Sequence, residues 1–318
     1  VYFGAWPNSP VPARTIRTGE KNFIFIAMDG LKNLAKTIFE RGTKQPSDLL
    51  SITYEEVEAY THDGWTLQKI FKSLMESMLC HEIIHVALTK EFSEGAFNKR
   101  LGSDEIARRV LHENYSEKPL DNNSIAPRIF LVKEELAALL AQLAYSENAI
   151  YFLDWTYDLQ ESSRGTHNLA SDIIIEHLSD RLGFANSLLK YEIAKKIVEK
   201  GEELSEDELK DIRQRTPKSY KEFVETIESP EERAYRYRYF LIGLKNTAIN
   251  KAAKKLYLQF FKILPSFDNA TIPEKVLTYP DKSTGLLEGI KEGVIKPGTG
   301  IIHLYDAIKA YGYTQTDL

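Results

Sequence analysis

The segment from Trp65 to about Glu91 constrains the fold more than any other part of this sequence. Apolar residues and two histidines recur there at alternating steps of four and three, which is the spacing of one face of an α-helix. The members of this face are Leu67, Phe71, Leu74, Met78, His81, His85 and Leu88. We therefore expect a long helix that buries this face, with Asp63 as its N-cap residue.

The rest of the pattern predicts a mainly α protein of the α+β class. One short buried strand is predicted at 23–28, where six apolar residues precede Asp29 and Gly30. Further helices are predicted at 31–41, 104–112, 132–148, 167–181, 188–200 and 230–264. The first twenty residues are expected to form an extended arm without regular structure, and the rest of 96–128 a loop. The segment 52–60 is ambiguous between strand and helix.

Composition limits the classes of protein that the chain can belong to. It has 318 residues, 43% hydrophobic and 27% charged, which is typical of a globular protein. The net charge of −5 gives no general attraction to nucleic acid or to anionic lipid. The apolar runs are too short to span a bilayer, so no membrane span is expected. The one cysteine, Cys80, excludes an internal disulfide and a four-cysteine zinc site and leaves the compartment open, with the cytoplasm slightly favoured.

The sequence His81-Glu82-Ile83-Ile84-His85 lies inside the long helix. Residues four apart on a helix share a face, so the two imidazoles can bind one zinc ion, with about 2.0–2.1 Å from each nitrogen to the metal. Glu82 is rotated off that line, where it can hold a water and take its proton. With 7 histidines in the chain, this pattern should arise by accident in roughly 1.5% of such sequences. The alternative is a pair of buried structural histidines.

This motif resembles the active-site helix of the zincin metallopeptidases. The resemblance implies a zincin-like core, a zinc ion bound by His81 and His85, and Glu82 as general base. A third ligand is then required. In the metzincins a Gly and a third His follow the second histidine, and in another branch of the zincins an Asp does. Neither pattern follows His85 in the right register. The gluzincin pattern remains, in which a second helix supplies a glutamate.

The predicted helix at 132–148 can supply that glutamate, because it carries Glu134 and Glu135 near its start. A stripe of alanines runs along one side of this helix and a stripe of leucines along nearly the opposite side. Glu134 projects over the alanine stripe, where another helix could approach closely, and is our predicted third ligand. Glu135 points between the stripes and is the alternative, either as ligand or as partner of a ligand histidine. The third possibility is that both are solvated surface carboxylates.

Several other polar residues are candidates for a role in the site. The oxyanion-stabilising group could be Tyr145, Tyr151, Tyr157 or His167, and the sequence does not choose among them. Cys80 is interpreted as a core residue. His177 follows a buried isoleucine run and is interpreted as structural. The basic and aromatic residues of 230–264 are interpreted as a solvated helix face, so nucleic acid is not expected as a partner.

These patterns predict three parts of the chain and one function. Residues 1–60 form an N-terminal arm and a strand and helix region, 61–200 the zincin-like metal-binding core, and 201–318 a helical C-terminal subdomain, which starts at a capping box of Ser205 and Glu208. The predicted function is zinc-dependent hydrolysis of peptide bonds in a peptide or protein substrate. The alternative is a zincin-like binding or regulatory protein without peptidase activity.

Overall fold

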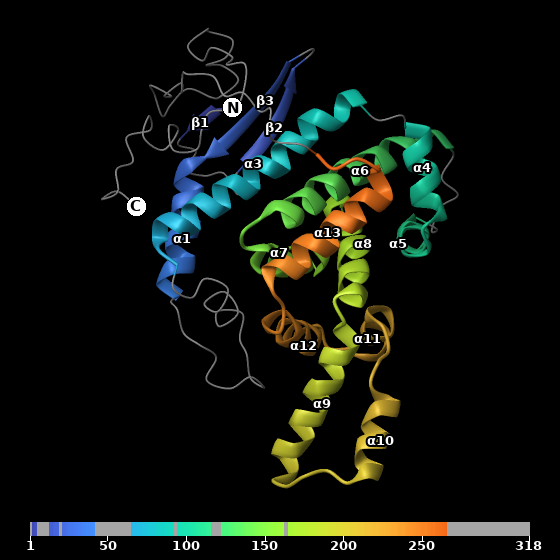
Figure 1. Cartoon of the computed structure of the whole chain (residues 1–318). Coiled ribbons are helices and arrows are strands. Elements are labelled where there is room, and N and C mark those ends of the chain that lie inside the picture. Colours follow the sequence, from blue (N-terminus) through green and yellow to red (C-terminus); the bar gives the residue numbers. More distant parts are fainter. Residues whose placement is uncertain are drawn as a thin grey trace. The chain divides into compact units, whose positions relative to one another are not determined.

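The computed structural model describes residues 2–4, 13–18, 21–41, 65–91, 94–115, 122–161 and 165–265. The chain divides into two compact units. The first unit contains the strands β1–β3 and the helices α1 and α3, and the second contains the helices α4 to α13 (Figure 1). Most described residues are helical, which confirms the expected mainly α class. The predicted features at 52–60 and Asp63, and the segment 266–318, lie outside the described residues.

The sheet of the first unit has three strands in the order β1-β3-β2. The strands are β1 (Tyr2–Gly4), β2 (Ala13–Thr18) and β3 (Lys21–Ala27). β1 is parallel to β3 and β2 antiparallel to it. The strand predicted at 23–28 corresponds to β3. The expectation of an arm without regular structure is wrong for β1 and β2, because both strands complete the backbone hydrogen bonds of β3, a long-range pairing that local sequence does not reveal.

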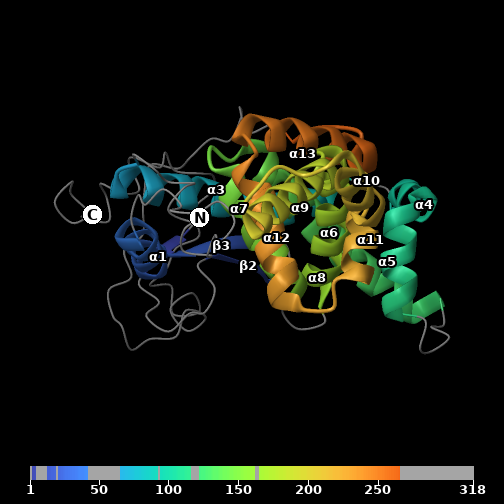
Figure 2. The ribbon, with the colours of Figure 1, turned by 90° about the horizontal axis from the view of Figure 1, so that it is seen from below.

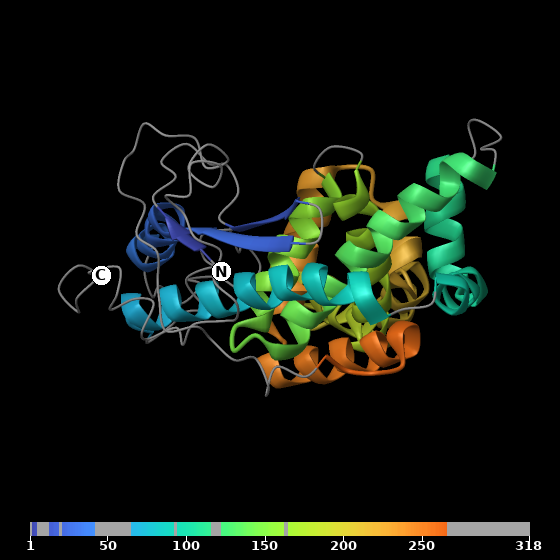
Figure 3. The same ribbon diagram turned by 90° about the horizontal axis from the view of Figure 1, so that it is seen from above.

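Two helices complete the first unit, α1 (Met28–Arg41) and α3 (Leu67–Glu91). α1 buries Leu31, Ala35 and Ile38, which are four and three residues apart and so share one face of the helix. α3 contacts β2 and β3, and Figure 3 shows it running alongside these two strands. The predicted apolar face of α3 is buried at Phe71, Leu74 and Met78. The long helix that carries the two histidines is thus confirmed.

In the second unit, α6 (Asn122–Tyr145) and α8 (Thr166–Arg181) form the centre of a helical bundle. They contact each other, and both contact α7 (Ala149–Glu161) and α13 (Asn246–Phe261). Figure 2 shows α13 along one edge of this bundle, and α4 (Glu94–Ser103) and α5 (Glu105–Tyr115) at another. Buried residues follow one another around α8 from Leu169 to Ser179, as expected of a helix enclosed on all sides.

Four helices complete the second unit, and an aromatic cluster joins the first, third and fourth of them, while the second packs against the first. They are α9 (Phe184–Lys200), α10 (Glu206–Arg215), α11 (Tyr220–Thr226) and α12 (Pro230–Ile242). Phe184 makes edge-to-face contacts with Tyr220, Phe223 and Phe240, at centroid distances of 4.9–5.5 Å. Figure 1 shows α9 and α10 extending away from the bundle as a pair.

Several predicted boundaries in the second unit need correction. α4 occupies part of the region expected to be a loop, and α6 begins ten residues before the predicted helix. The helix expected over 230–264 is two helices, α12 and α13, because the chain leaves α12 at Gly243. The capping box is confirmed: the Ser205 hydroxyl accepts from the Glu208 amide, and the Glu208 carboxylate accepts from the Ser205 amide.

Candidate metal centre

The histidine pair lies on α3, in the first unit. The Nε2 atoms of His81 and His85 are 3.1 Å apart, and their ring centroids are 4.8 Å apart. Two nitrogens on a tetrahedral zinc ion, each about 2.05 Å from the metal, are separated by about 3.3 Å. The two Nε2 atoms therefore already have nearly the separation that a shared metal requires. One N–H···N hydrogen bond between the rings has a similar length, so the alternative of a structural pair has the same geometry.

The third residue of the motif, Glu82, is buried beside the pair, with 7% of its surface exposed. It follows His81 directly, so its side chain leaves the helix about 100° from the line of the two histidines. A carboxylate held beside a metal site but off the ligand line has the placement of a general base rather than of a ligand.

Cys80 precedes the motif and is buried. Burial raises the pKa of its thiol to about 12. The thiol is therefore protonated at neutral pH and, in this environment, is a poor metal ligand. The interpretation of Cys80 as a small core residue agrees with this.

The two candidate third ligands lie on α6, in the second unit. Glu134 is buried, with 4% of its surface exposed, and the Glu135 side chain is 13% exposed. Neither residue is therefore a fully solvated surface carboxylate. Both stripes of α6 are buried as well: Leu136, Leu139, Ala137 and Ala141 are fully inaccessible to solvent, because several helices surround α6.

Glu135 is paired with a histidine that the sequence left unassigned. Its Oε2 atom lies 3.0 Å from Nε2 of His167, at the start of α8. Of the four candidates for oxyanion stabilisation, His167 is the one placed against the glutamate pair. Tyr157 instead stacks on Tyr237 in the aromatic cluster, at a centroid distance of 4.1 Å. The sequence pointed to His167 only because this residue follows the predicted helix at 132–148.

The structure thus brings the predicted residues together in two sets. His81, Glu82 and His85 are neighbours on α3 of the first unit, and Glu134, Glu135 and His167 are neighbours in the second unit. Each set, taken by itself, contains the nitrogen and oxygen donors that zinc prefers.

His177, which the sequence also singled out, belongs to a separate polar network in the second unit. Its Nε2 atom lies 2.9 Å from Oδ1 of Asp104, and the other carboxylate oxygen accepts from Gln259 at 2.7 Å. Asp104 also accepts from the Ala107 amide and caps α5. The network ties α5, α8 and α13 together, so the structural interpretation of His177 agrees with its surroundings.

Two arginines of α12, part of the sequence that suggested a basic face, form ion pairs inside the second unit. Arg236 pairs with Glu192 and Glu232, and Arg238 lies 2.9 Å from Asp158 and 3.3 Å from Asp154. Their charges are therefore balanced locally. Among the described helices, none has the length and apolar character needed to cross a membrane.

Comparisons with protein-family models, with curated proteins and with solved structures found no match to this chain.

Proposed function

We propose that this protein is a zinc-dependent peptidase whose metal is held by His81, His85 and Glu134. The observation that carries the proposal is the 3.1 Å separation of the two Nε2 atoms on α3, close to the separation that one tetrahedral zinc ion imposes. In this proposal the two histidines come from the first unit and the carboxylate from the second. Glu135 is the alternative third ligand.

The residues fit zinc in number and in kind. Two imidazoles and one carboxylate are the ligand set of catalytic zinc sites that keep a fourth position open. When bound, the metal would polarise the scissile carbonyl group and lower the pKa of a coordinated water to about 7. Glu135 would help to position His167, since its carboxylate lies 3.0 Å from the ring nitrogen Nε2.

Glu82 supplies the proton transfers in this proposal. Its carboxylate accepts a proton from the attacking water and later delivers it to the leaving amine, so that the amine departs as a neutral group. General acid–base catalysis of this kind contributes about 10²–10⁴-fold to a rate. Glutamine at this position has nearly the same shape but cannot accept the proton.

The experiment compares wild-type protein with Glu82→Gln on a pool of fluorogenic peptides, with zinc content measured in parallel. We expect the wild type to cleave peptides, a chelator to stop it, and Glu82→Gln to lose at least about 100-fold in rate while keeping its zinc. Glu76→Gln is the matched control, because Glu76 is an exposed residue of the same helix that pairs with Lys72.

Two results would contradict the proposal. Full activity in Glu82→Gln would remove Glu82 from the mechanism. One zinc per chain without cleavage of any peptide in the pool would instead support a zincin-like binding or regulatory protein.

A further inference from the structure

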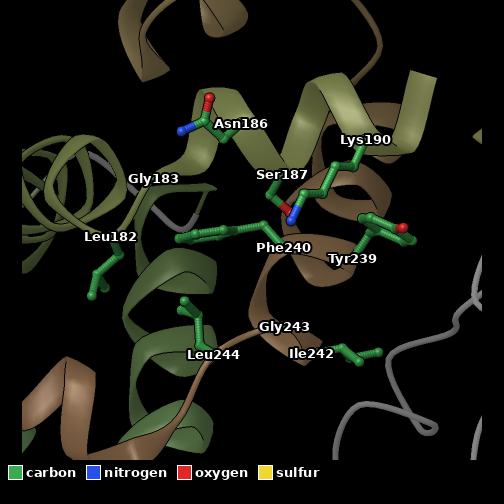
Figure 4. Close-up of a pocket in the computed structure, with 10 residues that line it drawn as sticks. All are labelled: Leu182, Gly183, Asn186, Ser187, Lys190, Tyr239, Phe240, Ile242, Gly243 and Leu244. Atoms are coloured by element: carbon green, nitrogen blue, oxygen red, sulfur yellow. The ribbon is translucent and has the colours of Figure 1, made fainter. Parts of the chain in front are cut away.

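The second unit contains a cavity of about 370 Å³, lined by residues of 182–190 and 239–244. The α8–α9 junction and the first turns of α9 form one side, and the end of α12 with the residues after it forms the other (Figure 4). Cavities that bind small molecules measure about 300–1,000 Å³. This one is at the lower end of that range, which suits a small ligand.

Two glycines leave this space open. Gly183 joins α8 to α9 in a left-handed conformation, with φ of 82°, which residues with a side chain adopt only with strain. A Cβ atom at Gly183 would have no neighbour within 4 Å. Gly243 ends α12 on the opposite side and also lines the cavity. The cavity therefore follows from the way in which both helices end.

The lining of the cavity combines apolar and basic groups. Ile242, Leu244 and Leu182 provide half-buried apolar surface, whereas Phe240 is only 2% exposed and contributes little. Figure 4 shows the side chains of Ser187 and Lys190 on the α9 side of the cavity, across from Tyr239 and Phe240 of α12. Ser187 and Lys190 are three residues apart on α9, so they are neighbours on one face of that helix.

Within the described part of the chain, no carboxylate lies within 4.0 Å of the Lys190 ammonium group. By contrast, Arg236 and Arg238 on α12 each pair with two carboxylates, and Lys196 on α9 pairs with Glu199 at 3.6 Å. The cavity thus has an apolar wall and a positive charge at its edge that is available to a ligand.

We propose that this cavity binds a small amphiphilic carboxylate. The apolar body of the ligand lies against Leu244 and Leu182, and its carboxylate pairs with the Lys190 ammonium and accepts from the Ser187 hydroxyl. The opposite charge and the apolar wall select an anion with a short hydrocarbon chain over a neutral or cationic molecule of the same size. This site shares no residue with the predicted metal ligands and does not rest on the proposed peptidase function.

The test is a calorimetric titration of the full chain with octanoate, octanol and octylamine, repeated on variants of α9. We expect saturable binding of octanoate, weaker binding of octanol and none of octylamine. Lys190→Ala should weaken octanoate binding about three- to tenfold, since an ion pair at the protein surface contributes modestly. Ser187→Leu, which fills the cavity, should abolish binding. Lys196→Ala is the matched control, an exposed lysine of the same helix that does not line the cavity.

Amide chemical shifts of Gly183 and Gly243 give a second readout, because they report on the cavity itself. Both should move with octanoate in the wild type and stay fixed in Ser187→Leu. No saturable binding, equal affinity for octanoate and octanol, or equal effects of Lys190→Ala and Lys196→Ala would each overturn the proposal.

Discussion

At the residue scale, the predicted metal site depends on which of two adjacent glutamates is the third ligand. The structure buries Glu134 and pairs Glu135 with His167. A carboxylate that already orients a histidine is suited to a supporting role. Glu134, which the alanine stripe of α6 favours, stays our predicted ligand, and Glu135 stays the alternative.

We expect Glu134→Gln to weaken zinc binding more than about 100-fold, because an uncharged amide replaces a ligand. Glu135→Gln removes only a partner of His167, which is not one of the proposed ligands, so zinc affinity should fall by less than about tenfold. Competition with a chromophoric chelator measures both affinities. The reverse order would identify Glu135 as the ligand.

The residues of the motif were predictable from sequence because both their chemistry and their spacing are local. Two histidines four apart on a helix lie together whatever the rest of the fold does. The pairing of Glu135 with His167 was not predictable in this way. It joins residues 32 positions apart, through the packing of α8 against α6.

At the element scale, Asp104 is the capping residue that links three helices of the second unit. Burial alone would raise the pKa of its carboxyl group. The hydrogen bonds from His177 and the Ala107 amide, with the nearby charges of His177 and Arg181, outweigh burial and lower that pKa below its ordinary value. The charged form is therefore the one that stabilises the junction of α5, α8 and α13.

Asp104→Asn should lower the free energy of unfolding at pH 7 by about 1.5–3 kcal/mol, the usual contribution of hydrogen bonds to a charged group. Because the folded pKa is depressed, this contribution is present above the ordinary aspartate pKa of about 3.9 and is lost as the pH falls through the folded value. Urea unfolding at a series of pH values should show the difference from wild type shrinking below about pH 4.

The control for this prediction is Asp211→Asn on α10, since Asp211 forms an exposed pair with Arg215. It should change stability by less than about 1 kcal/mol at every pH. A difference between Asp104→Asn and wild type that does not depend on pH would show that the charge of Asp104 is not what matters.

Elements with strong local signals were predicted well, and those defined by long-range contacts were not. The capping box of α10 and the stripe of α3 depend on residues within a few positions of each other. β1 and β2 owe their strand structure to pairing with β3, and sequence patterns carry little information about that pairing. The break between α12 and α13 was missed because apolar and basic residues continue on both sides of Gly243.

At the scale of the whole molecule, the helices after Lys200 help to enclose the bundle that carries the glutamate pair. α13 contacts α6, and its residues Leu256, Phe260 and Phe261 are buried. α11 and α12 contribute to the aromatic cluster around Phe184. This packing predicts that the second unit needs residues beyond Lys200 in order to fold.

A chain truncated after Lys200 should therefore lose the cooperative thermal unfolding of the second unit, because it exposes the apolar surface that α13 covers. Phe184→Ala, which removes one ring of the cluster from the full chain, should cost about 3–5 kcal/mol and keep the transition cooperative. Circular dichroism melts measure both. A truncated chain that still unfolds cooperatively and cleaves peptides at the wild-type rate would show that residues 201–318 are dispensable for catalysis.

X-ray absorption at the zinc edge shows whether His81 and His85 bind one zinc ion. We expect about one zinc per chain, with two imidazoles among its ligands and nitrogen or oxygen donors at about 2.0–2.2 Å. The imidazole signal should be lost in His81→Ala and His85→Ala and kept in His177→Gln, since His177 pairs with Asp104. A chain without zinc, or a zinc signal unchanged in both alanine variants, would rule out zinc binding by this histidine pair.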